Sequence, residues 1–334
     1  MTVCLGFMLS TTISAQMASV TPNWEIGDKV SYSFEQKTTS KSGKISIDNI
    51  KSIDLDLKVV DKNNDGYIIN ASYQNLTSSN AMEQAFFGLC RNLSFDYKTD
   101  ISGKLIGLAD SAKVVSDIKS LYQINKSDST MVSLSFFIQF AGAMMSDEMY
   151  LIGLLDEVNY IHTVNGLTLN SKKKADYSMK KKTTFGFDVP VTTHYTLKSV
   201  KDNIAIVTSV SNVKEDEFTA AFINFALGMT QKMFEGMSNL CQKKEEDNIN
   251  EEINDESNSE FTFQRFDDNF LEKQRSEIEK NLSDKFDLKM SESCTYSFDQ
   301  STQWLLSMNG SLTIKGKVDG QKANSTTQIK IVKK

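Results

Sequence analysis

Long runs in which apolar and polar side chains alternate are the feature that most restricts how this chain can fold. In residues 53–59, Ile, Leu or Val occupies every second position, and Asp or Lys stands between them. The same period of two recurs in residues 30–35, 67–73, 189–197, 204–210, 286–298 and 304–314. Successive side chains of a strand point to opposite faces, so this pattern predicts antiparallel sheet whose apolar face is buried and whose polar face is solvated.

Turn-forming residues separate several of these runs. The segment Asp61–Gly66, which reads Asp-Lys-Asn-Asn-Asp-Gly, predicts one hairpin, and Lys201–Asn203 predicts another. The first segment also matches the opening of an EF-hand calcium loop. The twelfth position of such a loop must be a bidentate Glu, but here it is Ser72. We therefore expect a plain hairpin without calcium, because Asn, Asp and Gly tolerate the left-handed conformations of tight turns.

Apolar residues at steps of three and four predict helices among the strands. The clearest helix covers Phe218 to Leu240, and we expect it to dock on the sheet made by the last long strands. Its single apolar stripe consists of Phe218, Phe222, Phe225, Met229, Met233, Met237 and Leu240. Residues 131–158 are the most apolar part of the chain and favour helices buried on a sheet, although residues 132–140 also fit a strand. A membrane span is the less favoured alternative for this run, because Ser, Gln and Gly interrupt it.

The order of these elements predicts an α+β fold with two similar halves of curved antiparallel sheet, each partly covered by apolar helices. The expected divisions are a signal peptide in residues 1–18, an N-terminal β-rich half in 19–125, an apolar helical connection in 126–165 and a C-terminal β-rich half in 166–334. Residues 243–260, within the second half, are dominated by Asp, Glu and Asn and predict an acidic linker.

The N-terminal residues predict export. The segment from Met1 to Gln16 has no charge and joins an apolar run to a small polar stretch, as the later regions of a signal peptide do. Cleavage after Ala15 or Ala18 is expected, with a basic region supplied by an upstream start codon, and the expected location is the periplasm or the cell surface. Of the later cysteines, Cys90, Cys241 and Cys294, at most two can form an internal disulfide, and buried thiols without a disulfide are favoured.

The charge balance argues against nucleic acid as a partner. The chain has 37 Lys and Arg residues against 43 Asp and Glu residues, a net charge of -6, which repels phosphate backbones overall. Two lysine clusters, residues 172–174 and 180–182, interrupt this acidic character. They fit either a basic surface for an anionic lipid headgroup or a solvated edge that prevents strand pairing, and the second interpretation is favoured.

Side chains that could perform catalysis or bind a metal are few. The only histidines are His162 and His194. His194 lies on the polar face of its strand, and no motif places a nucleophile or acid beside His162. The sequence has no Cys-x-x-Cys pair, phosphate-binding loop, nucleophile elbow or zinc-protease motif. We therefore expect no catalytic residue, metal site or cofactor, while the many carboxylates leave a hydrolase as a distant alternative.

Three segments resemble an uncharacterised group of exported Bacteroidota proteins with a repeated β-rich fold. They are Trp24–Tyr32, Val189–Val210 and Tyr296–Leu306, and Gln303 stands where a glycine is expected. The resemblance extends over most of the chain after the signal peptide. It implies export and curved antiparallel sheet with helices, and it supplies no catalytic residue.

Together these patterns favour a non-enzymatic exported cell-envelope protein that binds a lipid-like or other apolar ligand between sheet and helices. Pliable Phe and Met side chains suit such a cavity, and the candidate ligand-binding residues are Phe218, Phe222, Phe225, Met229 and Met233. The same stripe also fits plain protein core. The alternative function is a protein-binding or structural envelope module that uses exposed sheet edges. No transmembrane span is expected once the signal peptide is removed.

Overall fold

The computed structural model describes residues 15–81, 83–84, 93–124, 151, 154–182, 187–213, 216–228, 276–277, 280, 286–318 and 320–334. Several sequence predictions concern residues outside this set. They are the predictions for residues 1–14, Cys90, the apolar run 131–150, the helix residues 229–240 with Met229, Met233, Met237 and Leu240, Cys241 and the linker 243–260.

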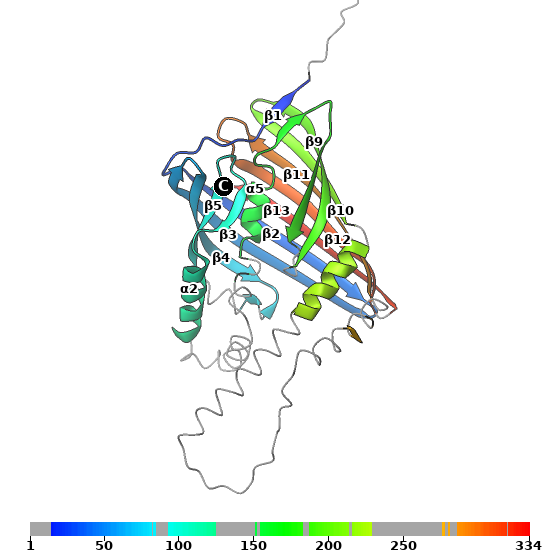
Figure 1. Ribbon diagram of the computed structural model, residues 1–334. Helices are drawn as coiled ribbons and strands as arrows, with labels where there is room; N and C mark the ends of the chain where they lie inside the picture. The colour runs from blue at the N-terminus through cyan, green and yellow to red at the C-terminus, as the bar shows by residue number, and fades with distance from the viewer. Residues whose placement is uncertain are drawn as a thin grey trace, which may run out of the picture.

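Eleven antiparallel strands form one curved, continuous sheet (Figure 1). In order across the sheet they are β6 (Leu105–Leu108), β5 (Ser94–Asp100), β4 (Gly66–Ser78), β3 (Ile45–Asn63), β2 (Lys29–Ser42), β13 (Gln321–Lys333), β12 (Leu305–Val318), β11 (Phe286–Asp299), β10 (Ile204–Val213), β9 (Asp188–Lys201) and β8 (Ala175–Lys182). The sheet is open, with β6 and β8 as its edges. A separate pair, β1 (Met17–Ser19) and β7 (Thr168–Asn170), lies beside β9.

The two halves of the chain form the two sides of this one sheet. Strands β2 to β6 make one side and β8 to β13 the other, and they join where β2 pairs with β13 from Tyr32 to Ser42. The predicted antiparallel, β-rich architecture is confirmed, but the sheet is single because two edge strands satisfy their backbone groups by pairing with each other. The similarity of the two halves remains a prediction.

Both predicted hairpins are confirmed. Between β3 and β4, the side-chain Oδ1 of Asn63 accepts hydrogen bonds from the backbone N–H groups of Asp65 and Gly66. A Cβ at Gly66 would lie 2.0 Å from the carbonyl oxygen of Thr99, so only glycine fits there. Between β9 and β10, Asp202 and Asn203 have φ angles of 52° and 61°, as a two-residue hairpin turn requires.

The hairpin register corrects one assignment of faces. In residues 204–210 the alternation suggests that Ile204 and Ile206 face the core, but both are exposed, whereas Ala205 and Val207 are buried. The turn pairs Ile204 with Lys201, and a bulge between Ile206 and Val207 places Val207 opposite Leu197. A shift of one residue in the pairing register moves every side chain of a strand to the other face. The register of the turn therefore decided which residues of β10 are buried.

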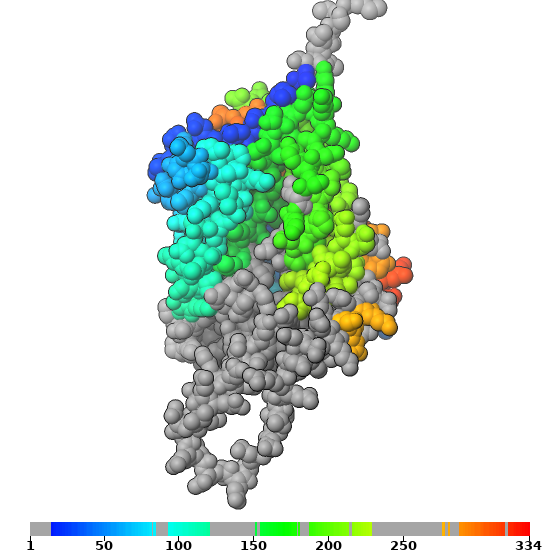
Figure 2. All heavy atoms as spheres, viewed as in Figure 1, coloured from blue at the N-terminus to red at the C-terminus, as the bar shows by residue number. Residues whose placement is uncertain are grey.

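One face of the sheet is the inner face and carries two separate apolar clusters. The larger, which we call the main core, involves β2 to β5 and β9 to β13 and includes Trp24, Tyr32, Phe34, Leu55, Leu57, Ile69, Tyr97, Tyr296 and Phe298. Two helices cover parts of it: α5 (Asp156–His162), through Val158 and Ile161, and α2 (Ser111–Ile124), through Val114 and Ile118. Figure 1 shows α5 lying against the inner face. Figure 2 shows the surface recessed between the strands that flank it.

A mostly polar row of side chains crosses the inner face beyond the main core, and Leu312 of β12 is its apolar member. Paired residues place Thr193, Ser211 and Glu292 side by side on β9, β10 and β11, and all three are buried. The hydroxyls of Thr193 and Ser211 are 2.8 Å apart. On the same row, Thr327 of β13 lies 3.1 Å from Thr38 of β2. Leu312 belongs to the smaller apolar cluster, which we call the end cluster and which otherwise lies beyond this row.

Candidate ligand-binding site

The end cluster joins a helix to the last long strands, as the sequence predicts. Residues 216–228 are helical, and Phe218 shares one buried apolar cluster with Leu288 and Met290 of β11 and Leu312 and Ile314 of β12. Phe218 is 1% exposed. Successive turns of a helix present residues four apart on one face, which brings Phe218 and Phe222 to the sheet together.

Phe187 ties the aromatic side chains of this helix together. Its ring centroid lies 5.6 Å from that of Phe218, 5.9 Å from that of Phe222 and 5.3 Å from that of Phe225. These separations are typical of favourable aromatic pairs. Phe187 directly precedes β9, so the cluster also anchors the helix to that side of the sheet.

Small side chains leave space on the inner face next to the end cluster. Ser42 of β2 pairs with Ala323 of β13, which in turn pairs with Gly316 of β12. One row nearer the main core, Ser40 and Ser325 face each other, and their hydroxyls are 2.8 Å apart. Because these residues carry at most one heavy atom beyond Cβ, they cannot fill the space between the bulkier side chains on either side.

A pocket of about 290 Å³ occupies this space. On one side it is lined by Ile45 and Ile47 of β3, and on the other by Phe218, Phe222, Leu288 and Ile314. The residues between these walls are Ser40, Lys41, Ser42, Ala323, Asn324 and Ser325. Its size is at the lower end of the range for small-molecule sites, and apolar walls around a few polar groups are typical of such sites.

The structure brings together only some of the predicted site residues. Phe218 and Phe222 line the pocket, whereas Phe225 packs on Phe187 without lining it. Met229 and Met233 lie outside the described residues. Ile45 and Ile47 were not among the predicted site residues, although they continue the face of Ile53 to Val59 toward the start of β3.

A buried ion pair lies between β3 and α5, and neither of its residues lines the pocket. The Nζ of Lys51, on β3, lies 2.6 Å from the Oε1 of Glu157 on α5, and both side chains are largely buried. The hydroxyl of Tyr73 is 3.1 Å from the other Glu157 oxygen and 2.5 Å from the carbonyl oxygen of Leu154. Burial alone would lower the pKa of Lys51, but the adjacent Glu157 carboxylate raises it above its ordinary value.

His162 has a structural environment rather than a catalytic one. Its Nδ1 lies 2.9 Å from the carbonyl oxygen of Gly103, which can only accept, so Nδ1 carries the hydrogen. The Nε2 atom then accepts from the hydroxyl of Tyr97 at 2.8 Å, and Trp24 packs edge-on against the ring. Burial lowers the pKa of His162 to about 4, although the Gly103 hydrogen bond opposes this shift.

The remaining candidate side chains lie apart from one another. His194 is exposed on β9, as predicted, and its Nδ1 is 2.7 Å from Asp176. Cys294 is buried on β11. Within the described ranges, no three His, Cys, Asp or Glu side chains gather closely enough to hold a metal ion. The helices in the same ranges include none that is long and apolar enough to cross a membrane.

Comparisons with known proteins add little to this geometry. No family model and no curated protein matches the sequence. Among solved structures, a chain of lipovitellin, studied for its lipid–protein interactions, is similar over 93% of this chain with a TM-score of 0.42 and 9% sequence identity. The chain spans about a quarter of the length of that lipovitellin chain. A likeness of this degree supports no conclusion about function.

Proposed function

We propose that this is an exported, non-enzymatic protein that binds a lipid-like or other apolar ligand in the pocket between β3 and the helix of residues 216–228. The observation that supports it is the pocket itself, in which two apolar walls face each other across small residues. Its shape suits a slender apolar group such as an alkyl chain. Water gains few hydrogen bonds there, because the hydroxyls of Ser40 and Ser325 already pair.

The apolar wall on β3 is exposed to solvent, and a bound ligand would bury it. Ile45 and Ile47 are 66% and 58% exposed, although they stand on the inner face of the sheet. Fully burying a side chain of this size stabilises a complex by roughly 1.5–3 kcal/mol. An apolar ligand that lies against both isoleucines would therefore gain a substantial part of its affinity from this wall.

The site is also separate from the main core, the larger of the two buried apolar clusters. The two apolar clusters are distinct, and on β9 to β11 the polar residues Thr193, Ser211 and Glu292 lie between them. Changes to the pocket lining should therefore leave the main core intact, so ligand binding and folding can be measured independently.

Filling the pocket tests this proposal most directly. In the Ala323→Leu variant, the new side chain occupies space that the ligand needs, and it removes no existing contact of the main core. We expect uptake of a fluorescent fatty-acid probe to fall at least about tenfold, a change of roughly 1.4 kcal/mol. The midpoint of urea unfolding should stay close to that of the wild type.

Two phenylalanines on one helix supply the matched pair for the same measurement. Phe222 lines the pocket and Phe225 does not, although both are half-buried and contact Phe187. Phe222→Ala should weaken probe binding, and Phe225→Ala should bind the probe nearly as the wild type does. If the wild-type protein takes up no probe and carries no lipid by mass spectrometry, the ligand proposal fails.

Export is the second part of the proposal, supported by the uncharged N-terminus and the resemblance to exported Bacteroidota proteins. The packing of β1 supports a proposed cleavage after Ala15 rather than after Ala18. Strand β1, Met17–Ser19, pairs with β7, and Ala18 is 1% exposed, so cleavage after Ala18 would remove a packed element. Gln16 also donates from its backbone N–H to the hydroxyl of Ser171.

We therefore expect the secreted protein, expressed with a basic start region upstream, to begin at Gln16. N-terminal sequencing of protein from the periplasmic fraction measures this directly. Replacing Ala15 with a bulky residue should block processing, while the same change at Ala18 should permit processing but weaken the fold. Recovery of cytoplasmic protein that retains Met1 would contradict export.

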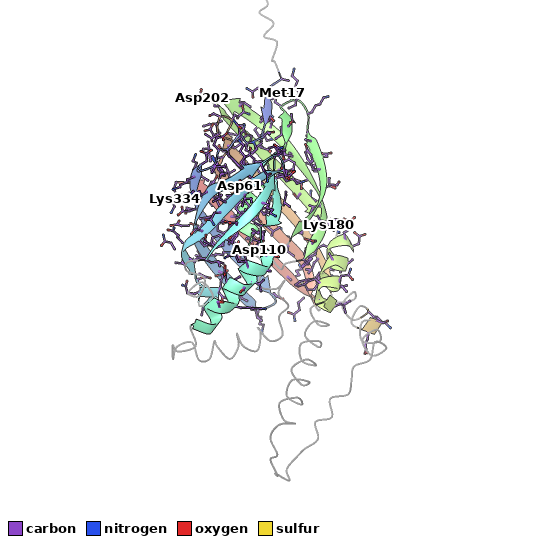
Figure 3. All side chains as sticks on the ribbon, turned by 60° about the vertical axis from the view of Figure 1, so that its left-hand side comes forward. Met17, Asp61, Asp110, Lys180, Asp202 and Lys334 are labelled. Atoms are coloured by element: carbon purple, nitrogen blue, oxygen red, sulfur yellow. The ribbon has the colours of Figure 1, made fainter. Side chains whose placement is uncertain are left out.

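The open sheet supports one alternative, a protein-binding module that uses its edges. The edge strand β8 contains eight residues, Ala175–Lys182, and Lys180 is exposed on it (Figure 3). Lysines on an edge strand discourage pairing with other strands. This alternative therefore ranks below the ligand-binding proposal.

A further inference from the structure

Six exposed lysines gather at the end of the sheet that holds the pocket. They are Lys41, Lys44, Lys289, Lys315, Lys317 and Lys322. Strand pairing sets Lys41, Asn324, Lys315 and Lys289 in one row across β2, β13, β12 and β11. In the part of the chain that the structure describes, none of the six forms an ion pair. We call these six residues the lysine patch.

The lysine patch contains two pairs of like charges that face each other directly. Lys289 is the cross-strand partner of Lys315, and Lys317 is the partner of Lys322. Like charges in this position destabilise a sheet. One acid, Asp287, is opposite Lys317 on the other side, and Asp48 lies on the neighbouring β3. The stability of the sheet therefore does not explain why lysine occupies these positions.

Exposed apolar side chains lie at the same end. Ile45 follows Lys44 directly after the β2–β3 turn, and Ile47 lies one row further along β3. Lys41 belongs both to the lysine patch and to the pocket lining. The paired lysines point to the outer face, because they alternate with the buried Leu288, Met290 and Ile314, whereas Ile45 and Ile47 stand on the inner face, so the two sets share only the end of the sheet. An end that carries basic groups on one face and exposed aliphatic side chains on the other can meet both layers of a bilayer surface, the anionic headgroups and the upper acyl region.

We propose that this end of the sheet docks on a phospholipid surface that carries anionic headgroups. The net charge of -6 over the whole chain makes the rest of the molecule avoid such a surface, so the patch also sets the orientation of docking. A nucleic acid would meet the lysines but leave the isoleucines in water, which is why a bilayer fits better. The pocket then lies beside the lipid. Docking goes beyond the proposed ligand-binding function and stands without it.

Co-sedimentation with vesicles tests the docking. The wild-type protein should bind vesicles of phosphatidylcholine and phosphatidylglycerol at about 0.1 M salt, bind pure phosphatidylcholine far more weakly, and be released at about 1 M salt. Each lysine near the surface contributes about fivefold to the partition coefficient. In the Lys315→Glu/Lys322→Glu variant, we therefore expect binding at least about 25-fold weaker.

This variant should fold, because each new Glu faces a lysine and turns a like-charge pair into an opposite-charge pair. The matched control is Lys172→Glu/Lys174→Glu, which changes the net charge equally in a different lysine cluster, near β7. The control should bind vesicles as the wild type does. Both lysine variants should take up the fatty-acid probe normally, and Ala323→Leu should bind vesicles normally, so docking and ligand binding can fail separately.

Three results would overturn the docking proposal. The first is a wild-type protein that shows no preference for anionic vesicles, and the second is a control variant that loses as much binding as the patch variant. The third is a protein that binds single-stranded DNA through the patch but does not bind vesicles, which would assign the lysines to a different polyanion.

Discussion

Replacing Lys51 with Met is expected to lower the free energy of unfolding by about 3–5 kcal/mol, because it leaves the buried carboxylate of Glu157 without its cation. The Nζ–Oε1 distance is 2.6 Å, and the Glu157 side chain is only 3% exposed. The Tyr73 hydroxyl near the other oxygen cannot neutralise the charge. The measurement is urea unfolding at neutral pH.

Removing the charge of Glu157 instead of that of Lys51 should lower the free energy of unfolding by less. In Glu157→Gln, the amide keeps the shape of the carboxylate, and Lys51 retains 16% exposure, contact with the ring of Phe34, and the nearby charges of Glu83 and Asp156. The double variant Lys51→Met/Glu157→Gln should therefore be more stable than Lys51→Met alone. This non-additivity is the signature of a coupled pair.

The exposed pair formed by Lys113 and Asp117 on α2 provides the control. Water screens such a surface pair, so Lys113→Met should produce a far smaller change than Lys51→Met. Strictly additive effects of the two core substitutions would show that Lys51 and Glu157 do not stabilise each other.

The second large effect is a loss of stability in mild acid. His162 is neutral in the folded protein, where its pKa is about 4 instead of the ordinary 6.5. The unfolded chain therefore binds one more proton than the folded protein between these values. The stabilisation is complete above about pH 6.5, declines by about 1.4 kcal/mol per pH unit as the pH falls, and is lost by about pH 4, a total of roughly 3 kcal/mol.

Replacing the titrating ring isolates this contribution. His162→Gln should be less stable at neutral pH, but its stability should depend much less on pH between 6.5 and 4 than that of the wild type. The carboxylates of Asp54 and Asp299 act at lower pH, because hydrogen bonds from Asn75 and Ser301 hold their pKa values below 3.8. An unchanged slope in His162→Gln would refute this role.

Sequence pattern was most informative where one strand or one turn determines the outcome. The period of two identified most of the buried face, and the Asp-Asn and Asn-Asp-Gly signals located both hairpins. It was least informative where both faces of a strand carry apolar residues. In β10 the exposed Ile204 and Ile206 are larger than the buried Ala205 and Val207. The register of the turn, not the hydrophobicity of the strand, decided which face was buried.

The candidate pocket could be predicted only in part, for a related reason. Phe218 and Phe222 follow from helical spacing within one segment, which is a local property of the chain. The opposite wall, Ile45 and Ile47, is more than 170 residues away in sequence, and the small residues between come from both ends of the chain. No local pattern specifies which small residues will lie beside one another.

By itself, the amino-acid sequence determined the strands, their turns and the apolar stripe of the helix, because these depend on steric preferences and side-chain periodicity over a few residues. Only the tertiary structure decided that β2 and β13 pair to make one sheet, that Lys51 meets Glu157, and that lysines face lysines at the end of the sheet that holds the pocket. Such juxtapositions arise from the order and register of strands, which are set by the packing of the whole inner face rather than by any single segment.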